Sequence, residues 1–522
     1  MEVGSDDNRP ELVFGLVGPA GVPLKQMSNV LKEHLKTFNY KSIDIHLSDL
    51  LKNFSGWTDE VNNGEYERIQ HRQKMALQYR KMLNDGDGAA LARSGIAEIR
   101  KQRSKITSNE NIPASSQAYI IDQLKHPSEV ELLREIYGAS FILLAGHAHK
   151  GIRIENLAKQ MAESDDKRVN GQYNSKADDI IDIDDSQEDK DGLGQNTRDT
   201  YPLADYFADL NLGNDANGIK RFIDLLFGHP FHTPYPKELA MYQAWSGSLR
   251  SSDHNRQVGA VIARHELKSD RVSNIDIVAS GVNEVPRRGG GYYWTENSPD
   301  TRDQYLDAND DNRAEIIKRS ALRELLERIK NLGWLNDERN KELPNKLARE
   351  LLPNLKGTQF MNIGEFSRPV HAEMAALIDS AKRGVAVDGL SMYVTTFPCH
   401  NCAKHIIAAG IKQVIYLEPY PKSRANDLHP EEIELESING KASDDKVAFT
   451  AFTGIAPRQY GCVFSMSARG TKKGLSLKEW EANKQSLSPR YVMRNSSEAY
   501  FLSERQELEK LPIEIYKHEK NK

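Results

Sequence analysis

The sequence predicts an α/β protein with two domains, and three observations lead to this prediction. The chain has 522 residues, more than one hydrophobic core usually supports. Short apolar runs alternate with amphipathic stretches of about ten residues or more, which is typical of parallel strands covered by helices. Around residues 164–191 this pattern gives way to an acidic stretch low in aromatic residues, DDIIDIDDSQEDKDG, which indicates a mobile insertion or linker.

The composition is that of a globular protein, with 39% hydrophobic and 28% charged residues. No apolar run approaches the about 20 residues that cross a bilayer, and the polar start MEVGSDDNRP does not resemble a secretory signal, so no membrane partner is expected. Three cysteines cannot form a disulfide framework, so a reducing, cytoplasmic location is expected. The net charge of −5 disfavours a large binding surface for duplex DNA.

The first domain is expected over residues 1–230. Its predicted elements are strands at 12–18, 42–47, 118–122 and 140–146, with helices at 24–38 and 128–137. Asp122, at the end of the third of these strands, could hold a metal ion or cap the helix that follows.

The segment GLVGPAGVPLKQM follows the first strand and precedes the first helix, which is the position of a phosphate-binding loop. A standard loop reads G-x-x-x-x-G-K-[ST], and counting from Gly18 its second glycine and its lysine fall on Pro23 and Leu24. Lys25 comes one place late, and Pro23 removes an N–H donor, so phosphoryl transfer is not expected. Nucleotide binding through Gly18, Gly21 and Lys25 is one prediction, and a plain strand–helix turn is the other.

The second domain is expected over residues 241–487, followed by a tail at 488–522. Its predicted elements are strands at 256–264, 275–283, 391–397 and 414–418, with helices at 312–332, at 340–352 and in PVHAEMAALIDSAKRG.

Two of the three cysteines, Cys399 and Cys402, stand three residues apart in TTFPCHNCAKHII, where a strand is expected to give way to a helix. Pro398 suits the end of the strand, residues three apart are neighbours on a helix, and the N–H groups at a helix start favour thiolates. The third ligand is His371, 28 residues before Cys399, a separation that fits one helix, a turn and a strand. Three protein ligands are the pattern of a catalytic zinc site, whose fourth position takes water.

Glu373 follows His371 by two residues, and at a helix N-terminus both side chains can reach a site beyond the helix end. Glu373 is therefore predicted to take a proton from zinc-activated water and pass it to a leaving amine. His-x-Glu followed by Pro-Cys-x-x-Cys is the pattern of zinc nucleobase deaminases. The alternative is a structural zinc site closed by a fourth ligand, for which His400 and His405 are near in sequence. Cys462 stands alone and is predicted to be a buried apolar residue.

The second domain resembles the deoxycytidylate deaminases of the cytidine deaminase superfamily. The stretches that carry the resemblance are RQVGAVIA, IVASGVNEVP, HAEMAAL, TTFPCHNCAKHII and VIYLEPYPKS. The resemblance implies an α/β/α sandwich with a central mixed sheet, zinc on the His and Cys ligands named above, and Glu373 as proton shuttle. It also implies that Asn283 contacts the deoxyribose, and it favours Arg256 as a phosphate contact.

The first domain resembles the P-loop kinase-like region that is fused to deaminases in bacterial anti-phage systems. The carrying stretch is AYIIDQLKHPSEVELLREIYGASFILLAG, and FTGIAPRQYGC near the C-terminus fits the same two-part family. The resemblance implies deamination of dCTP and dCMP to the uracil nucleotides, which depletes these deoxycytidine nucleotides during phage infection. It further implies a homo-oligomer, a regulatory deoxynucleotide and, for some members, an inhibitory small RNA.

Other functions stay open at this point. A housekeeping dCMP deaminase that supplies dUMP would use the same site, and so would a deaminase of single-stranded nucleic acid, which needs a basic channel with stacking aromatics. The basic runs RIQHRQK, YRK and EIRKQRSK lie in the other domain, where they could face solvent, the phosphates of a nucleotide or an RNA. A zinc-stabilised binding module would need no catalysis. Tyr292, Trp294 and Phe397 could hold a flat cytosine ring.

Overall fold

The computed structural model describes residues 9–58, 64–83, 86–186, 192–211, 213, 215–254, 256–268, 271–294, 296, 302, 313–335, 339–355, 358, 360, 367–420, 423–435, 445–466, 476–490 and 497–511. The chain forms two compact units, one built from Met1–Tyr242 with Ala451–Lys522 and the other from Gln243–Leu435 with Ala442–Thr450. Both units are α/β, as predicted. Among the helices that the structure describes, none combines the length and the apolarity that crossing a bilayer requires.

The first unit contains a six-stranded sheet with the order β12-β5-β4-β1-β3-β2. Its strands are β1 (Leu12–Val17), β2 (Lys41–His46), β3 (Gln117–Leu124), β4 (Phe141–His147), β5 (Tyr206–Asp209) and β12 (Gly454–Ile455). Neighbours from β2 to β5 pair in parallel, and β12 is antiparallel to β5. Every residue of β1 is buried, because a central parallel strand is covered on both faces. The P-loop kinase-like character of this unit stays a prediction.

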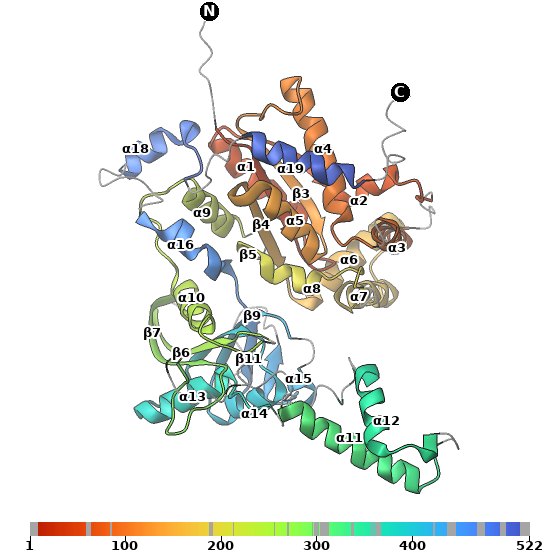
Figure 1. Cartoon of the computed structure of the whole chain (residues 1–522). Coiled ribbons are helices and arrows are strands. Elements are labelled where there is room, and N and C mark those ends of the chain that lie inside the picture. The colour runs from red at the N-terminus through yellow and green to blue at the C-terminus, as the bar shows by residue number, and fades with distance from the viewer. Residues whose placement is uncertain are drawn as a thin grey trace, which may run out of the picture. The chain divides into compact units, whose positions relative to one another are not determined.

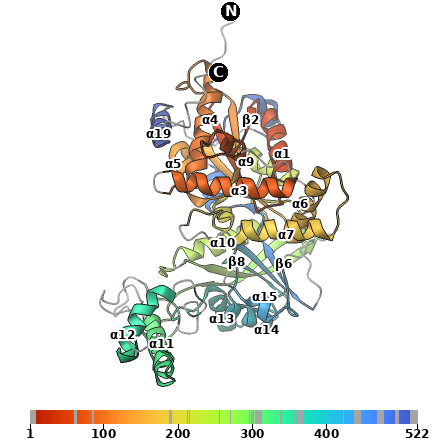
Figure 2. The same ribbon diagram turned by 90° about the vertical axis from the view of Figure 1, so that its right-hand side faces the viewer.

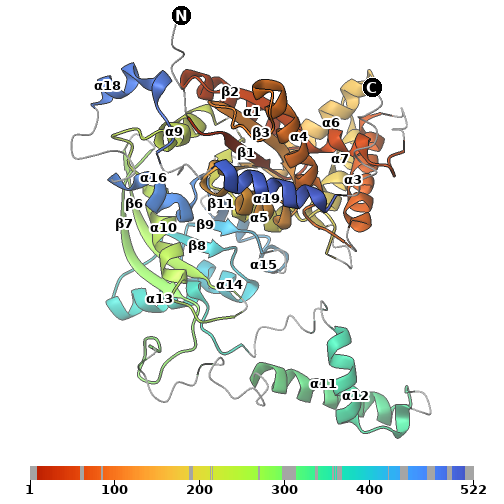
Figure 3. The same ribbon diagram turned by 45° about the horizontal axis from the view of Figure 1, so that its top comes forward.

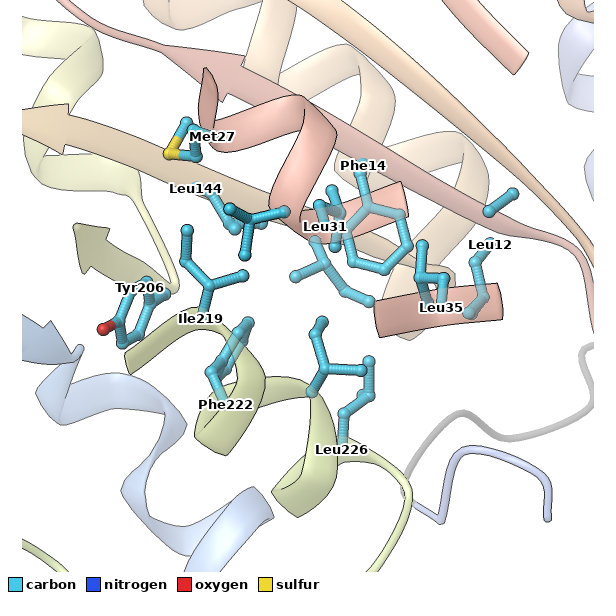
Figure 4. Packing of buried hydrophobic residues seen from close by; sticks show 14 of the residues in the cluster. Leu12, Phe14, Met27, Leu31, Leu35, Leu144, Tyr206, Ile219, Phe222 and Leu226 are labelled. Carbon is cyan, nitrogen blue, oxygen red and sulfur yellow. The ribbon is translucent and has the colours of Figure 1, made fainter. Parts of the chain in front are cut away.

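The helices of this unit surround the sheet (Figure 1). They are α1 (Leu24–Thr37), α2 (Leu47–Leu50), α3 (Glu65–Met82), α4 (Ala90–Thr107), α5 (Pro127–Tyr137), α6 (Lys150–Ser164), α7 (Gly171–Ser186), α8 (Thr197–Thr200), α9 (Ala216–Leu226), α16 (Tyr460–Phe464), α18 (Leu477–Ala482) and α19 (Ser497–Glu509), with α10 (Pro236–Ser248) leading into the second unit. The spacing of Met27, Leu31 and Leu35 places them on one face of α1, where they join the core between the sheet and α9 (Figure 4). The strands and helices predicted between residues 12 and 146 are confirmed.

The chain returns to the first unit after β11, which corrects the expected domain boundary at residue 487. Val463, Trp480 and Leu487 lie in the hydrophobic core of the first unit, and the indole Nε1 of Trp480 donates to the carbonyl of Phe227 at 3.2 Å. Strand β12 has two residues, too few to leave a periodic signal in the sequence.

The segment expected to be a tail contains the helix α19, which lies along α4 and α5 (Figure 3). Glu504 of this helix is fully buried and receives two hydrogen bonds of 2.8 Å from Arg103 and one of 2.9 Å from the hydroxyl of Tyr137. Removing one partner of a buried pair costs about 3–5 kcal/mol, because the other charge is left uncompensated. This ion pair therefore anchors the C-terminal helix.

The acidic segment, expected to be a mobile insertion or linker, forms the helix α7 over most of its described part. Tyr173, Ala177, Ile180 and Ile181 recur at helical spacing and are buried against α6 in a cluster of their own. The acidic residues hid this apolar stripe, because four buried hydrophobic positions among sixteen residues give a weak compositional signal. The last part of the predicted stretch, residues 187–191, lies outside the described residues.

The second unit contains a mixed sheet with the order β10-β11-β9-β8-β6-β7, as predicted. Its strands are β6 (Gly259–Lys268), β7 (Arg271–Val282), β8 (Ser391–Thr396), β9 (Gln413–Glu418), β10 (Ile433–Leu435) and β11 (Val447–Ala451), and its helices are α11 (Arg313–Asn331), α12 (Pro344–Leu351), α13 (Ala372–Arg383), α14 (His400–Ala408) and α15 (Ala425–Leu428). Strand β6 is antiparallel to β7 and β8, and β8 is parallel to β9. Figure 2 shows α13 and α14 beside this sheet.

Candidate functional site

The first element of the site is the start of helix α13, where His371 is the N-cap residue in an extended backbone conformation. An isolated β-bridge between Val370 and Glu284 holds this start beside the end of β7, with reciprocal N–H···O bonds of 3.0 and 3.2 Å. Gly281 of β7 lies so close to the helix that a Cβ there would overlap the backbone of Ala372 and Ala376. A glycine at this strand position thus lets the helix approach the sheet.

The second element is the junction between β8 and α14. Strand β8 is buried throughout, and after Pro398 the chain enters the helix with Cys399 as N-cap residue. Cys402 lies in the first turn and is 1% exposed. The hydroxyl of Ser423 donates to the carbonyl of Pro398 at 2.7 Å, which fixes the turn that precedes the two cysteines.

The side chains of His371, Cys399 and Cys402 converge. The Nδ1 atom of His371 lies 3.3 Å from each of the two Sγ atoms, and all three candidate ligand atoms lie within 4.8 Å of one another. Zn–S bonds of about 2.3 Å and Zn–N bonds of about 2.0 Å imply N···S separations of about 3.5 Å around a tetrahedral ion. The observed separations are close to this value, and imidazole with thiolates is a donor set that suits zinc. The predicted ligands therefore fit a zinc ion in identity and in spacing.

Glu373 lies in the first turn of α13 and is 4% exposed. Burial raises its pKa to about 7, and the negative charge of Cys399 adds to the effect. A hydrogen bond with Cys402 and, beside it, the contact with His371 lower the pKa of the Cys399 thiol to about 4. The hydrogen bond with Cys399 raises the pKa of His371 to about 9. The cluster thus brings a buried carboxyl group within interaction distance of a thiolate and an imidazole.

Neither His400 nor His405 belongs to this ligand group, in the part of the chain that the structure describes. The group has three protein ligands there, which is the pattern of a catalytic rather than a closed structural site. Cys462 is also outside the group, but it is exposed rather than buried, which corrects the sequence-based expectation. It follows Tyr460 and Gly461 in the short helix α16, which turns its side chain to the surface.

Asn283 follows β7 directly, and its amide group holds the loop that carries Arg256. Its Oδ1 accepts from the N–H of Val258 at 2.7 Å, and its Nδ2 donates to the carbonyl of Arg256 at 2.8 Å and to the carboxylate of Asp253 at 3.2 Å. Both amide hydrogens are therefore engaged within the protein. The geometry makes Asn283 a positioning residue for this loop, in addition to the sugar contact predicted for it.

Arg256 is half-exposed, pairs with Glu418 at 3.4 Å and has its guanidinium 5.8 Å from the ring centre of Tyr420. Strand β6 begins at Gly259, so Arg256 lies in the loop before the strand rather than in the strand. Asp253 and Tyr420 were missed by the sequence reasoning, although both interact electrostatically with the cluster, Asp253 with His371 and Tyr420 with Cys399. The signal for Tyr420 was available, because it stands in the quoted stretch VIYLEPYPKS.

The three aromatic residues considered for holding a cytosine ring have other contacts. Tyr292 and Trp294 lie over the guanidinium of Arg250, with 4.4 and 4.2 Å from its carbon to the two ring centres. Phe397 packs against Tyr416 and Phe449 in the interior of the second unit.

Gly18, Gly21 and Lys25 lie together in the first unit, where they line a cavity of about 610 Å³, and they are not part of the metal cluster, which the second unit holds. Gly21 has φ +84°, and a Cβ there would overlap the carbonyl oxygen of Arg153. Glycine is thus required at this point both by conformation and by close packing.

Comparison with known proteins supports the metal site. Residues 235–418 match the family model of the cytidine and deoxycytidylate deaminase zinc-binding region. The chain is 52% identical over 54 residues to "ComE operon protein 2" of Bacillus subtilis, covering 10% of this chain and 29% of that protein. It is 44% identical over 55 residues to the deoxycytidylate deaminase of Enterobacteria phage T4, covering 10% and 28%, and 39% identical over 75 residues to that of Homo sapiens, covering 14% and 41%. The matched regions thus span less than half the length of these curated relatives.

Among solved structures, a dCMP deaminase from the cyanophage S-TIM5 in complex with dCMP and dUMP aligns with 42% of this chain and 100% of its own. The sequence identity is 19% and the TM-score is 0.23. The apo form of the same protein aligns with 17% identity and a TM-score of 0.21.

Proposed function

We propose that the protein is a zinc-dependent hydrolase that deaminates free deoxycytidine nucleotides, dCMP or dCTP, to the corresponding uracil nucleotides and ammonia. The observation that carries the proposal is the convergence of His371, Cys399 and Cys402 beside the buried Glu373. The match of residues 235–418 to a family of cytidine and deoxycytidylate deaminases supports the same reaction.

His371 and the two cysteines would hold the metal ion from two helix N-termini. Zinc in such a site supplies a Lewis acid that activates water for attack on a carbon–nitrogen double bond. The positive ends of α13 and α14 help to keep the two sulfurs in the thiolate form that binds metal.

Glu373 would carry the protons of the reaction. Water adds to C4 of cytosine, and Glu373 takes the proton that the water releases and delivers it to N3. The proton of the new C4 hydroxyl group then moves to the amino group, the C4–N bond breaks and the C4 carbonyl forms, so that one water is consumed and one ammonia leaves. The buried position of Glu373 keeps bulk water from exchanging with the proton that it holds.

Arg256 would contact the phosphate of the nucleotide from the loop that Asn283 holds in place. Its guanidinium is half-exposed and therefore accessible, and Tyr420 lies below it. A guanidinium can bind phosphate through two parallel hydrogen bonds, which gives both affinity and orientation.

In a cell, this reaction would remove deoxycytidine nucleotides, and on that basis we propose a role in defence against phage infection by nucleotide depletion. Assembly into homo-oligomers, regulation by a deoxynucleotide and inhibition by a small RNA are further predictions from the family resemblance. A housekeeping supply of dUMP would use the same chemistry, and the two roles differ in whether dCTP is a substrate.

The experiment incubates the full chain with dCMP, dCTP and a single-stranded deoxycytidine oligonucleotide, and measures uracil products by mass spectrometry. Uracil from a free nucleotide and none from the oligonucleotide supports the proposal. Uracil from the oligonucleotide alone would assign the site to nucleic-acid deamination, and no uracil from any of the three would contradict catalysis of this kind.

A further inference from the structure

The cavity beside the Gly18–Lys25 loop is lined by one face of helix α3. Arg68, Arg72 and Arg80 recur at spacings of four and eight residues and all contribute to the lining. These arginines come from two of the basic runs whose partner the sequence left open. The volume of about 610 Å³ is in the range that holds a small-molecule ligand.

Arg80 is 1% exposed, and its guanidinium is only partly paired. Nη2 donates to Glu129 at 2.8 Å, whereas Nε and Nη1 are buried without a hydrogen-bond partner in the part of the chain that the structure describes. The second oxygen of Glu129 accepts from the backbone N–H groups of Lys125 and His126. This carboxylate therefore both pairs with Arg80 and binds the backbone before helix α5. Buried N–H groups without an acceptor are costly, which indicates that an acceptor is bound there in the functional state.

Asp184 of helix α7 contacts the backbone of the loop between Gly18 and Lys25. Its carboxylate accepts from the N–H of Ala20 at 2.7 Å and from Nζ of Lys125 at 3.0 Å, and it is 1% exposed. The same Lys125 donates to the carbonyl of Gly18 at 2.8 Å. A loop N–H together with a lysine is the combination that binds a phosphate oxygen in phosphate loops. The chain therefore places its own carboxylate where a ligand phosphate would bind.

Asp122 of β3, the strand beside β1, also lines the cavity and offers an acceptor. Asp122 lies inside β3 rather than at a helix N-cap, since α5 is capped by His126. One carboxylate oxygen lies 2.5 Å from Nδ1 of His46, and the other is buried without a hydrogen-bond partner among the described residues. Such an oxygen suits a ligand hydroxyl or amino group, or a bound magnesium ion.

We propose that this cavity binds a small phosphorylated molecule with hydrogen-bond donors, that Arg80 receives its anionic group, and that Asp184 competes with the ligand for the loop. A phosphate that approaches the N–H of Ala20 meets the negative charge of Asp184, so binding displaces that carboxylate. Because Asp184 lies on α7, which packs on α6, ligand binding shifts the balance between a closed and an open position of this helix. Figures 2 and 3 show α3, α6 and α7 side by side around this region.

The inference concerns binding and not phosphoryl transfer. Pro23 stands where the loop would offer another N–H, and the residue directly after Lys25 is Gln26, which has no hydroxyl group to hold magnesium. The ligand class is shared by nucleoside phosphates and simpler phosphates, and the presence of Asp122 favours the former.

The test is isothermal titration calorimetry of the full chain with ATP, dTTP and inorganic tripolyphosphate, each with and without magnesium. Asp184→Asn keeps an acceptor for Ala20 but removes the competing charge, so binding should tighten by about tenfold or more. Asp182→Asn, an exposed acid of the same helix, is the matched control and should leave affinity unchanged.

Arg80→Lys keeps a positive charge beside Glu129 but loses the N–H groups of Nε and Nη1, so binding should weaken by about tenfold. Lys81→Met, on the exposed side of the same helix, is its control.

Tighter binding of Asp184→Asn and weaker binding of Arg80→Lys support the proposal. Binding of a nucleotide but not of tripolyphosphate assigns the ligand to nucleoside phosphates. Absence of binding to both wild type and Asp184→Asn, or weaker binding of Asp184→Asn, would overturn it. If Arg80→Lys does not fold, the affinity of Asp184→Asn relative to wild type still tests the proposal.

Discussion

Both units place polar groups at a junction between a strand and a helix, after β8 in the second unit and after β1 in the first. The two junctions differ in what their polar groups contact. After β8, Cys399 and Cys402 of the junction lie close together, and His371 from another helix start completes a group of three candidate metal ligands. After β1, the loop offers an N–H and a carbonyl, and the chain itself occupies them with Asp184 and Lys125. The first junction gathers ligand atoms that could hold a metal ion, whereas the groups of the second are paired with side chains of the same chain.

The difference shows what a motif can and cannot specify. Two cysteines three residues apart at a helix start must lie on one side of it, so their chemistry follows from local geometry. A glycine-rich turn fixes only the backbone, and its function depends on which distant side chains reach it. The same local architecture therefore gives a metal centre in one unit and a self-occupied anion position in the other.

Glu373→Gln should have the largest effect. It removes the proposed proton carrier beside His371, Cys399 and Cys402 but keeps the size of the side chain. We expect kcat for dCMP to fall by about 10²–10⁴-fold with the zinc content unchanged. Product formation and metal content are measured on the same preparation, with the exposed Lys382→Gln on the same helix as control. Activity within tenfold of wild type would show that the metal junction works without this carboxyl group.

Gly21→Ala tests how tightly the other junction is packed. The new Cβ would overlap the carbonyl oxygen of Arg153 at a φ of +84°, whereas Gly192 has a φ of +71° and open space around it. We expect Gly21→Ala to lower the free energy of unfolding by about 1–2 kcal/mol more than Gly192→Ala does, as measured by urea denaturation. Equal losses would mean that the backbone around Gly21 has room to move away from the carbonyl of Arg153.

Arg256→Ala should have a more limited effect, confined to substrate binding at the metal junction. Loss of a charge-assisted contact to phosphate should raise KM for dCMP by about tenfold and change kcat less. Arg264→Ala removes an exposed arginine from strand β6 and serves as the control. If both variants show the same KM, the phosphate is held by other residues.

Cys462→Ser should have no effect on either junction. The thiol is exposed and lies outside the ligand group in the described part of the chain. Zinc content and turnover of dCMP should equal those of wild type, and a loss of zinc on this substitution would show that a ligand has been assigned wrongly.

The sequence predicted the parts of both sites that depend on neighbours along the chain. The separation between His371 and Cys399 was expected to hold a helix, a turn and a strand, and it holds α13 and β8. The contact of Asp184 with Ala20 joins residues 164 positions apart, and no periodicity or spacing encodes it. The same is true of Trp480, whose burial against Phe227 brings the C-terminal part of the chain into the first unit.

The sequence also did not predict which charged side chains are buried. The sequence left the basic run that contains Arg80 open between solvent, a nucleotide's phosphates and an RNA, and it placed Glu504 in a tail; charged side chains are seldom fully buried. Each is buried beside an opposite charge, Glu129 for Arg80 and Arg103 for Glu504, and such pairing depends on the tertiary fold.

The most direct test of the metal centre is the zinc content of purified wild type, Cys402→Ser and Cys462→Ser, determined by mass spectrometry of the metal after dialysis. About one zinc ion per chain is expected in wild type and in Cys462→Ser, and a small fraction of that in Cys402→Ser, which lacks a thiolate ligand. Wild type without zinc, or Cys402→Ser with as much zinc as wild type, would contradict the account.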